Sequence, residues 1–161
     1  MVDNILKKII SKKEQRISEF KKKISIESLK EKINQNKTYV NFKEKIENNI
    51  AKNKISLIAE IKKASPSAGI IIKDYNPVVV AKKYYENKAT CLSVLTEEDF
   101  FKGNLIHVHK IKQKIKLPIL CKDFFIDPFQ IHLAKSYGAD AILIILAGVT
   151  EKIAHELYEN A

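Results

Sequence analysis

The sequence is poor in several residue types, and each shortage excludes a class of protein. It has no Trp, four Gly, four Pro and two Cys in 161 residues. Few Gly and Pro, together with 45% hydrophobic residues, exclude a disordered chain. Two cysteines are too few for a disulfide framework, and their positions do not match a metal-binding signature. The chain is long enough to form one ordinary globular domain with its own core.

Long apolar runs are also missing. The longest, Ala141 to Val149, is about half as long as a membrane-spanning helix. The first residues, Met-Val-Asp-Asn-Ile-Leu-Lys-Lys, do not show the positive, apolar and small-residue regions of a signal peptide. We therefore expect a cytoplasmic location and no membrane partner. Cys91 and Cys121, each inside a short apolar run, are then expected to be buried and reduced.

Arginine is almost absent, although the net charge is +10. Arg16 is the only one, whereas nucleic-acid-binding proteins usually contact bases and phosphates through arginine. No motif combines aromatic and basic residues. A lysine-rich, solvated helix surface therefore explains the charge better than a nucleic-acid partner does. The positive potential still favours an anionic ligand.

The first 54 residues have a helical pattern. Over residues 3–35, apolar residues recur at spacings of three and four and predict amphipathic helices that pack on something larger. After a break at 35–38, the spacing of Phe42, Ile46 and Ile50 predicts one more short helix. We assign residues 1–54 to an N-terminal helical extension.

From residue 55 onward, strand-like and helix-like segments alternate. Short, apolar, β-branched runs predict strands at 55–61, 91–96, 118–122 and 141–146. A loop and a helical pattern follow each strand, and Asn76-Pro77, Asp127-Pro128 and Thr150 are good helix starts. Such alternation predicts an α/β fold with parallel strands and helices packed outside them.

Two arrangements fit this alternation. Four units are half of an eightfold β/α barrel, which typically takes ~250 residues. An open doubly wound sheet has the same alternation, but no G-x-G-x-x-G follows the first strand here. We therefore predict a TIM-barrel type fold, with residues 55–161 forming a half-barrel of four βα units.

Charged residues end two of the predicted strands. Glu60 and Lys62 end the first strand and share a face because strand side chains alternate, and Lys122 ends the third. If the strands curve into a barrel, the three groups converge at the end where β/α barrels carry their function. A structural ion pair at a strand end is an equally good interpretation. In the functional one, a desolvated lysine near another cation has a lowered pKa and transfers protons.

Aromatic residues lie on the loops at the same end. They are Phe100, Phe101, Phe124 and Phe125. Loop packing explains at least two of them. The others are candidates for an apolar wall against an aromatic substrate.

Four ordered motifs carry a resemblance to a known family. Residues 58–67 (Ile-Ala-Glu-Ile-Lys-Lys-Ala-Ser-Pro-Ser) resemble the first-strand signature of indole-3-glycerol phosphate synthases. Residues 91–103, 118–131 and 138–141 are similar to the regions of that family's second, third and fourth strands. Residues 5–13 look like part of the family's N-terminal extension.

The resemblance implies a lyase of tryptophan biosynthesis that uses no metal or organic cofactor. Its substrate, 1-(2-carboxyphenylamino)-1-deoxyribulose 5-phosphate, is cyclised, decarboxylated and dehydrated to indole-3-glycerol phosphate. Carried over by position, Lys122 is the general acid, Lys62 contacts anionic groups and assists proton transfer, and Glu60 orients both lysines. The implied substrate-binding residues are Ser65 and Pro66, near the anthranilate carboxylate, and Phe101 and Phe124, beside the ring.

The resemblance also implies what residues 1–161 do not carry. The family's second catalytic carboxylate lies on the fifth strand, a substrate-binding Asn on the sixth, and the main phosphate site after the seventh and eighth. We therefore expect little synthase activity from the chain alone, and a complementary half-barrel or self-association as its partner. The alternative is a non-catalytic half-barrel that at most binds an anionic aromatic ligand.

Overall fold

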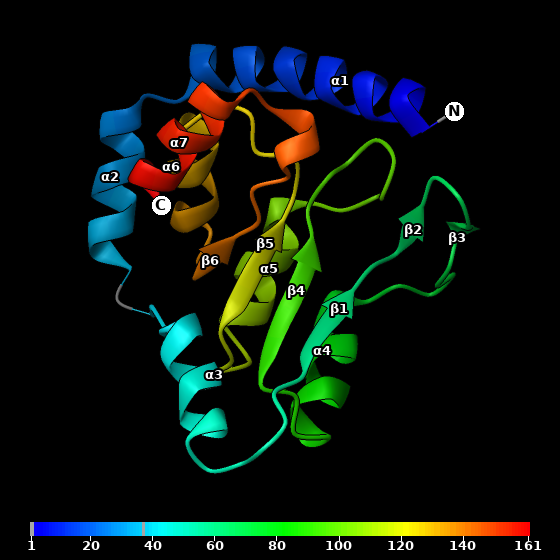
Figure 1. Ribbon diagram of the computed structural model, residues 1–161, viewed down its shortest axis with the longest axis vertical. Coiled ribbons are helices and arrows are strands. Elements are labelled where there is room, and N and C mark those ends of the chain that lie inside the picture. Colours follow the sequence, from blue (N-terminus) through cyan, green and yellow to red (C-terminus); the bar gives the residue numbers. More distant parts are fainter. Residues whose placement is uncertain (1, 37) are drawn as a thin grey trace.

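A computed structural model describes residues 2–36 and 38–161 (Figure 1). The helices are α1 (Val2–Lys23), α2 (Ile26–Gln35), α3 (Phe42–Ile50), α4 (Pro77–Glu86), α5 (Leu105–Lys112), α6 (Phe129–Ser136) and α7 (Glu151–Asn160), with a 3-10 turn η1 (Leu146–Gly148). The main sheet consists of β1 (Ile58–Ile61), β4 (Cys91–Leu95), β5 (Ile119–Lys122) and β6 (Ala141–Ile142). A small antiparallel hairpin, β2 (Ala64–Ser65) and β3 (Gly69–Ile70), follows β1.

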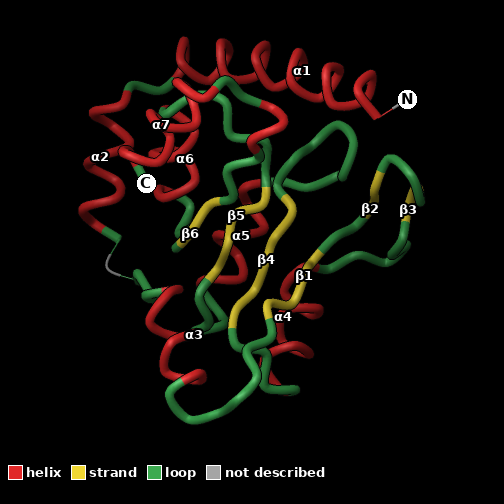
Figure 2. The backbone as a smooth tube through the Cα atoms, viewed as in Figure 1, coloured by secondary structure: helices red, strands yellow, loops and turns green. Residues whose placement is uncertain are grey.

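The main sheet is parallel, and its strands lie in chain order, β1-β4-β5-β6 (Figure 2). One face of it packs against all four helices that follow its strands. Ile61, Val94 and Cys121 on that face belong to the same core as residues of α4, α5, α6 and α7. The helical members of the core include Ala81, Ile111, Ala134 and Leu157. A doubly wound sheet carries helices on both faces. The α/β prediction is confirmed, and the arrangement is consistent with part of a TIM barrel.

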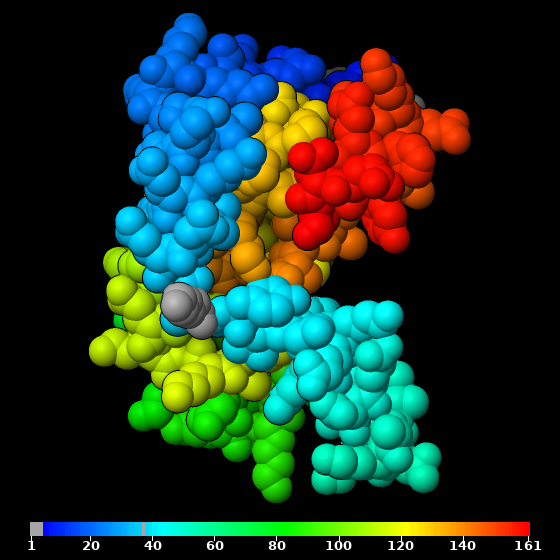
Figure 3. All heavy atoms as spheres, turned by 90° about the vertical axis from the view of Figure 1, so that its left-hand side faces the viewer, coloured from blue at the N-terminus to red at the C-terminus, as the bar shows by residue number. Residues whose placement is uncertain are grey.

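The N-terminal helices cover this layer on two sides. Helix α1 lies across the carboxyl ends of the strands, and α2 packs beside α6 (Figure 1). Ile17, Leu29, Phe129 and Leu133 form the buried cluster that joins α1 and α2 to α6. Figure 3 shows a hollow between α2 and α7 with α6 at its base. The division of the chain at residue 54 stays a prediction.

Helix α3 lies at the opposite end of the sheet from α1 (Figure 1). The Asn49 side chain donates a hydrogen bond of 3.1 Å to the hydroxyl of Thr90, the residue before β4. The same hydroxyl accepts from the Leu57 amide, next to the start of β1. Helix α3 is thus joined to the amino ends of β1 and β4, at the end of the sheet opposite α1.

The amphipathic pattern over 3–35 forms the two helices α1 and α2, and Ser25 caps α2 by accepting a hydrogen bond from the Ser28 amide. Two predicted strand boundaries are wrong by several residues. The first strand begins at Ile58, because Ile55 is 94% exposed and pairs with no strand. The fourth strand pairs only over Ala141–Ile142, since β5 is its one partner in the described residues and the ladder ends there.

Other local expectations are confirmed. The Asn76 side chain accepts hydrogen bonds from the Val78 and Val79 amides and so caps α4. Thr150 caps α7 in the same way. Both cysteines are buried and free. In the part of the chain that the structure describes, no helix is long and apolar enough to cross a membrane.

Candidate active site

Glu60, Lys62 and Lys122 meet at the carboxyl end of the sheet. One carboxylate oxygen of Glu60 lies 2.7 Å from Lys62 Nζ, and the other lies 2.5 Å from Lys122 Nζ. The strand register brings them together. Glu60 is in register with Ser93, and Lys122 with Leu95, which lies two residues further along β4 and so on the same face. The contact predicted from the sequence is therefore present.

The electrostatics of this cluster favour charged groups. Partial burial raises the pKa of Glu60, but the hydrogen bonds and charges of Lys122 and Lys62 outweigh burial and lower it below its ordinary value. Glu60 is therefore ionised at neutral pH. Two ammonium groups share one carboxylate, and each of the three side chains is about one-third exposed. The excess positive charge can attract an anion from solvent.

Ser65 and Pro66 lie in the hairpin that follows this cluster along the chain. The Ser65 hydroxyl accepts a hydrogen bond of 3.2 Å from the Ala68 amide and lies 3.4 Å from the Ser67 hydroxyl. Pro66 is exposed. Within residues 2–36 and 38–161, no hydrogen bond joins Ser65 to Glu60 or to the lysines. The pair thus follows the end of β1 in a hairpin of its own, and its role as a substrate subsite stays a prediction.

Phe101 and Phe124 come together from two different loops. Their ring centroids are 6.3 Å apart, and their planes are tilted by 39°. Both are partly exposed, whereas Phe125 is 2% exposed and belongs to the core. Phe124 follows Lys122 by two residues, at the carboxyl end of β5. Phe125 therefore packs in the core, and a role of Phe101 and Phe124 as a wall for a substrate stays a prediction.

A buried carboxylate, missed in the sequence, shapes the loop that carries Phe101. Glu97 is completely buried, and its carboxylate accepts hydrogen bonds from the amides of Asp99, Phe100 and Phe101. The loop then returns so close to β4 that a Cβ atom on Gly103 would lie 2.4 Å from the Leu95 carbonyl oxygen. Glycine is required here because backbone fills the space.

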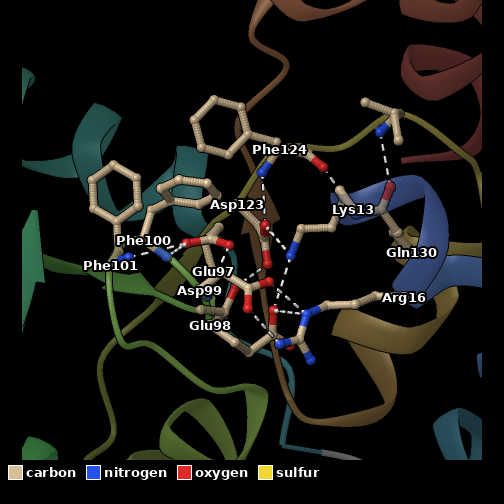
Figure 4. A network of polar contacts seen from close by, with 12 residues as sticks. Lys13, Arg16, Glu97, Glu98, Asp99, Phe100, Phe101, Asp123, Phe124 and Gln130 are labelled. Carbon is tan, nitrogen blue, oxygen red and sulfur yellow. Dashed lines mark hydrogen bonds and ion pairs between the residues drawn. The ribbon is translucent and has the colours of Figure 1, made fainter. Parts of the chain in front are cut away.

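A second missed feature is an ion-pair network between α1 and the two loops (Figure 4). Lys13 Nζ lies 3.1 Å from Glu98 and 2.8 Å from Asp123, and its side chain is 5% exposed. Arg16 donates to both carboxylate oxygens of Asp99, at 2.8 and 2.9 Å. Burial disfavours the ammonium form of Lys13, but the two carboxylates outweigh burial and raise its pKa.

The sequence held a signal for this network. Lys13 lies midway between Ile9 and Ile17, four residues from each, so it interrupts an apolar stripe that faces the protein. Both isoleucines are buried. A lysine at such a position requires a partner, and the run Glu97–Asp99 after the second strand offers three carboxylates.

Comparisons with known proteins bear on the identity of this site. The family model described as indole-3-glycerol phosphate synthase matches residues 6–161. The chain belongs to the indole-3-glycerol phosphate synthase family. The resemblance carried by the four motifs is thereby confirmed.

Individual relatives support the same family assignment. The indole-3-glycerol phosphate synthase of Aliarcobacter butzleri (strain RM4018) is 44% identical over an alignment of 161 positions that covers 98% of this chain and 60% of the relative. The synthase of Trichodesmium erythraeum (strain IMS101) is 42% identical over 149 residues, 92% of this chain and 50% of the relative. The chain spans about half the length of the curated relatives it matches.

Proposed function

We propose that this chain supplies one half of the active site of an indole-3-glycerol phosphate synthase. The enzyme would cyclise, decarboxylate and dehydrate 1-(2-carboxyphenylamino)-1-deoxyribulose 5-phosphate to indole-3-glycerol phosphate, CO2 and water. The observation that carries the proposal is the contact of Lys62 and Lys122 with one carboxylate, Glu60, beside a phenyl wall, in a chain of this family.

Lys122 is the proposed general acid. Ring closure leaves negative charge on the ketose oxygen, and a positioned ammonium group can protonate it. Glu60 would hold that ammonium in place through the hydrogen bond of 2.5 Å and stabilise its charge before the proton is transferred. The half-open position of Lys122 leaves room for a substrate to approach.

The anionic groups of the substrate would lie near Lys62 and the hairpin. Lys62 offers a positive charge beside Glu60 and would assist proton transfer. Ser65 offers a hydroxyl to the anthranilate carboxylate, and the exposed Pro66 would border the same subsite. This assignment predicts that the substrate bridges the charged cluster and the hairpin.

The phenyl pair would hold the aromatic ring of the substrate. The ring centroids of Phe101 and Phe124 are 6.3 Å apart, and the two ring planes are tilted relative to each other. Aromatic groups pack well against the edges and faces of such rings. Loss of CO2 then requires only that ring closure leave a cationic, electron-poor intermediate, so no cofactor is invoked. The rest of the pocket must exclude water to keep the lysine charges effective.

Residues 1–161 alone are proposed to have little activity. The sheet face that carries Glu60 also presents Ile58, 44% exposed, and Leu143 is 38% exposed beyond the end of β6. We propose that the chain forms a half-barrel, the first four βα units of a (β/α)8 barrel, and that a complementary half covers this face. That half would supply the second carboxylate and the main phosphate site.

Mixing tests the proposal. The chain is assayed alone and together with a polypeptide covering the part of the Aliarcobacter butzleri relative that this chain does not match. Formation of indole-3-glycerol phosphate is followed by its fluorescence. We expect turnover far below ~1 per second from the chain alone, and clear product formation from the mixture. Turnover of ordinary size from the isolated chain, or none from an associated mixture, would contradict the proposal.

A further inference from the structure

Lys13 is a buried lysine of α1 that contacts the two loops after β4 and β5. Its ammonium group reaches two carboxylates that come from different loops, Glu98 after β4 and Asp123 after β5 (Figure 4). Among the described residues, helix α1 contributes no ion pair to the cluster around Glu60. It nevertheless reaches the loops that carry the phenyl pair.

Asp123 connects Lys13 to the backbone near Lys122 and Phe124. Its Oδ1 accepts a hydrogen bond of 2.8 Å from the Phe124 amide, and its Oδ2 accepts one of 2.7 Å from the Thr96 hydroxyl. The Thr96 amide in turn donates to the carbonyl of Lys122 at 3.1 Å. The backbone of Lys122 is therefore held by Thr96, and the next residue along the chain is held by Lys13.

Glu98 connects Lys13 to the loop after β4, which carries Phe101. It directly follows Glu97, whose carboxylate accepts from the amides of Phe100 and Phe101. One ammonium group thus ties together the two loops whose rings, Phe101 and Phe124, lie 6.3 Å apart. A shift of either loop changes the width of this wall, and misplacement by about 1 Å costs up to ~100-fold in rate.

We propose that Lys13 is a positioning residue of the synthase site: by holding Asp123 and Glu98 it fixes the spacing of Phe101 and Phe124 beside Lys122. Helix α1 thereby determines how well the site accepts an aromatic substrate. The effect of Lys13 on catalysis rests on the proposed function, whereas its effect on the position of the two loops does not.

A second buried lysine provides a matched control. Lys112 is also 5% exposed and pairs with the buried Asp140, which accepts further hydrogen bonds from the Ile119 and Val40 amides. This pair lies at the amino end of β5, away from the phenyl wall. Lys112→Met should therefore lower stability much as Lys13→Met does, without reaching the site.

Amide hydrogen exchange of this chain tests the positioning role without any assay. Lys13→Met is expected to speed exchange at the Phe101 and Phe124 amides by at least ~10-fold relative to Lys112→Met. The Val80 amide, bonded to the Asn76 carbonyl at the start of α4, belongs to neither network and should change equally in both variants. Lys13→Arg, which keeps the charge, should restore most of the protection. If Lys13→Met does not fold, Lys13→Gln keeps a donor and permits the same comparison.

The kinetic arm uses the mixture described above. Lys13→Met is expected to raise the KM for the substrate by roughly tenfold with a smaller fall in kcat, whereas Lys112→Met changes neither by more than about twofold. Equal effects of the two variants on both exchange and KM would overturn the proposal. If the wild-type mixture forms no product, the proposed function fails, and the exchange data still decide whether Lys13 holds the loops.

Discussion

Glu60 on β1 and Lys122 on β5 share a hydrogen bond of 2.5 Å, although strand β4 lies between their strands and 62 residues separate them in the chain. Parallel register produces the contact: both side chains leave the same face of the sheet near the carboxyl ends of their strands. Lys62 joins the same carboxylate at 2.7 Å. The two lysines keep Glu60 charged, and this has a measurable consequence.

Replacing Glu60 should give a pH-dependent loss of stability. The lysines lower the pKa of Glu60 below its ordinary 4.5 despite partial burial, so its ionised form stabilises the fold above about that pH. This contribution is lost as pH falls through the lowered pKa. Because the groups are about one-third exposed, Glu60→Gln should cost only ~1 kcal/mol or less at pH 7.

Urea unfolding of the wild type and Glu60→Gln at pH 7 and near pH 3 measures this. The difference in free energy of unfolding should shrink at the lower pH. A difference that stays constant, or grows, would show that the contacts of Glu60 with Lys62 and Lys122 are not the source of its stabilisation.

Much of this arrangement could be predicted from the sequence. Strands and helices alternate in a way that apolar periods of two and 3.6 residues reveal locally. The same local patterns place Glu60, Lys62 and Lys122 at strand ends. The length of β6 could not be predicted in the same way. Its apolar run extends to residue 146, but a strand exists only where a neighbour pairs with it, and β5 pairs only with Ala141–Ile142.

Gly103→Ala is expected to disturb the loop that carries Phe101. The new Cβ would lie 2.4 Å from the Leu95 carbonyl oxygen, and backbone cannot give way as a flexible side chain does. We expect a loss of ~2–3 kcal/mol in urea unfolding. Gly69→Ala is the comparison: its φ of +63° is unfavourable for alanine, but nothing lies within 4 Å, so about 1 kcal/mol is expected. An equal or larger loss at Gly69 would contradict this account of the loop.

Both thiols should be unreactive in the folded chain. Burial raises the pKa of Cys91 to about 11 and that of Cys121 to about 12, so almost no thiolate forms at pH 8. An aromatic disulfide reagent should modify neither cysteine before unfolding and both in strong denaturant. Fast modification of Cys121 in the native chain would contradict its position under α1, α5 and α6.

The network around Lys13 shows what sequence patterns leave out. The stripe that Lys13 interrupts indicates that the lysine needs a partner, but Asp123 lies 110 residues away, and only the packing of α1 across the strand ends selects it. Glu97 is harder still to recognise. A buried carboxylate that accepts three amides of its own loop leaves no periodic trace in the sequence.

Lys122 is the proposed acid of a synthase to which this chain contributes one half. The most direct measurement is the kcat of the mixture with Lys122→Ala, compared with Lys152→Ala, whose side chain is 85% exposed on α7. We expect Lys122→Ala to lower kcat by ~100-fold or more while the chain stays folded, and Lys152→Ala to leave it unchanged. A folded Lys122→Ala variant that retains wild-type turnover would show that Lys122 is not the acid.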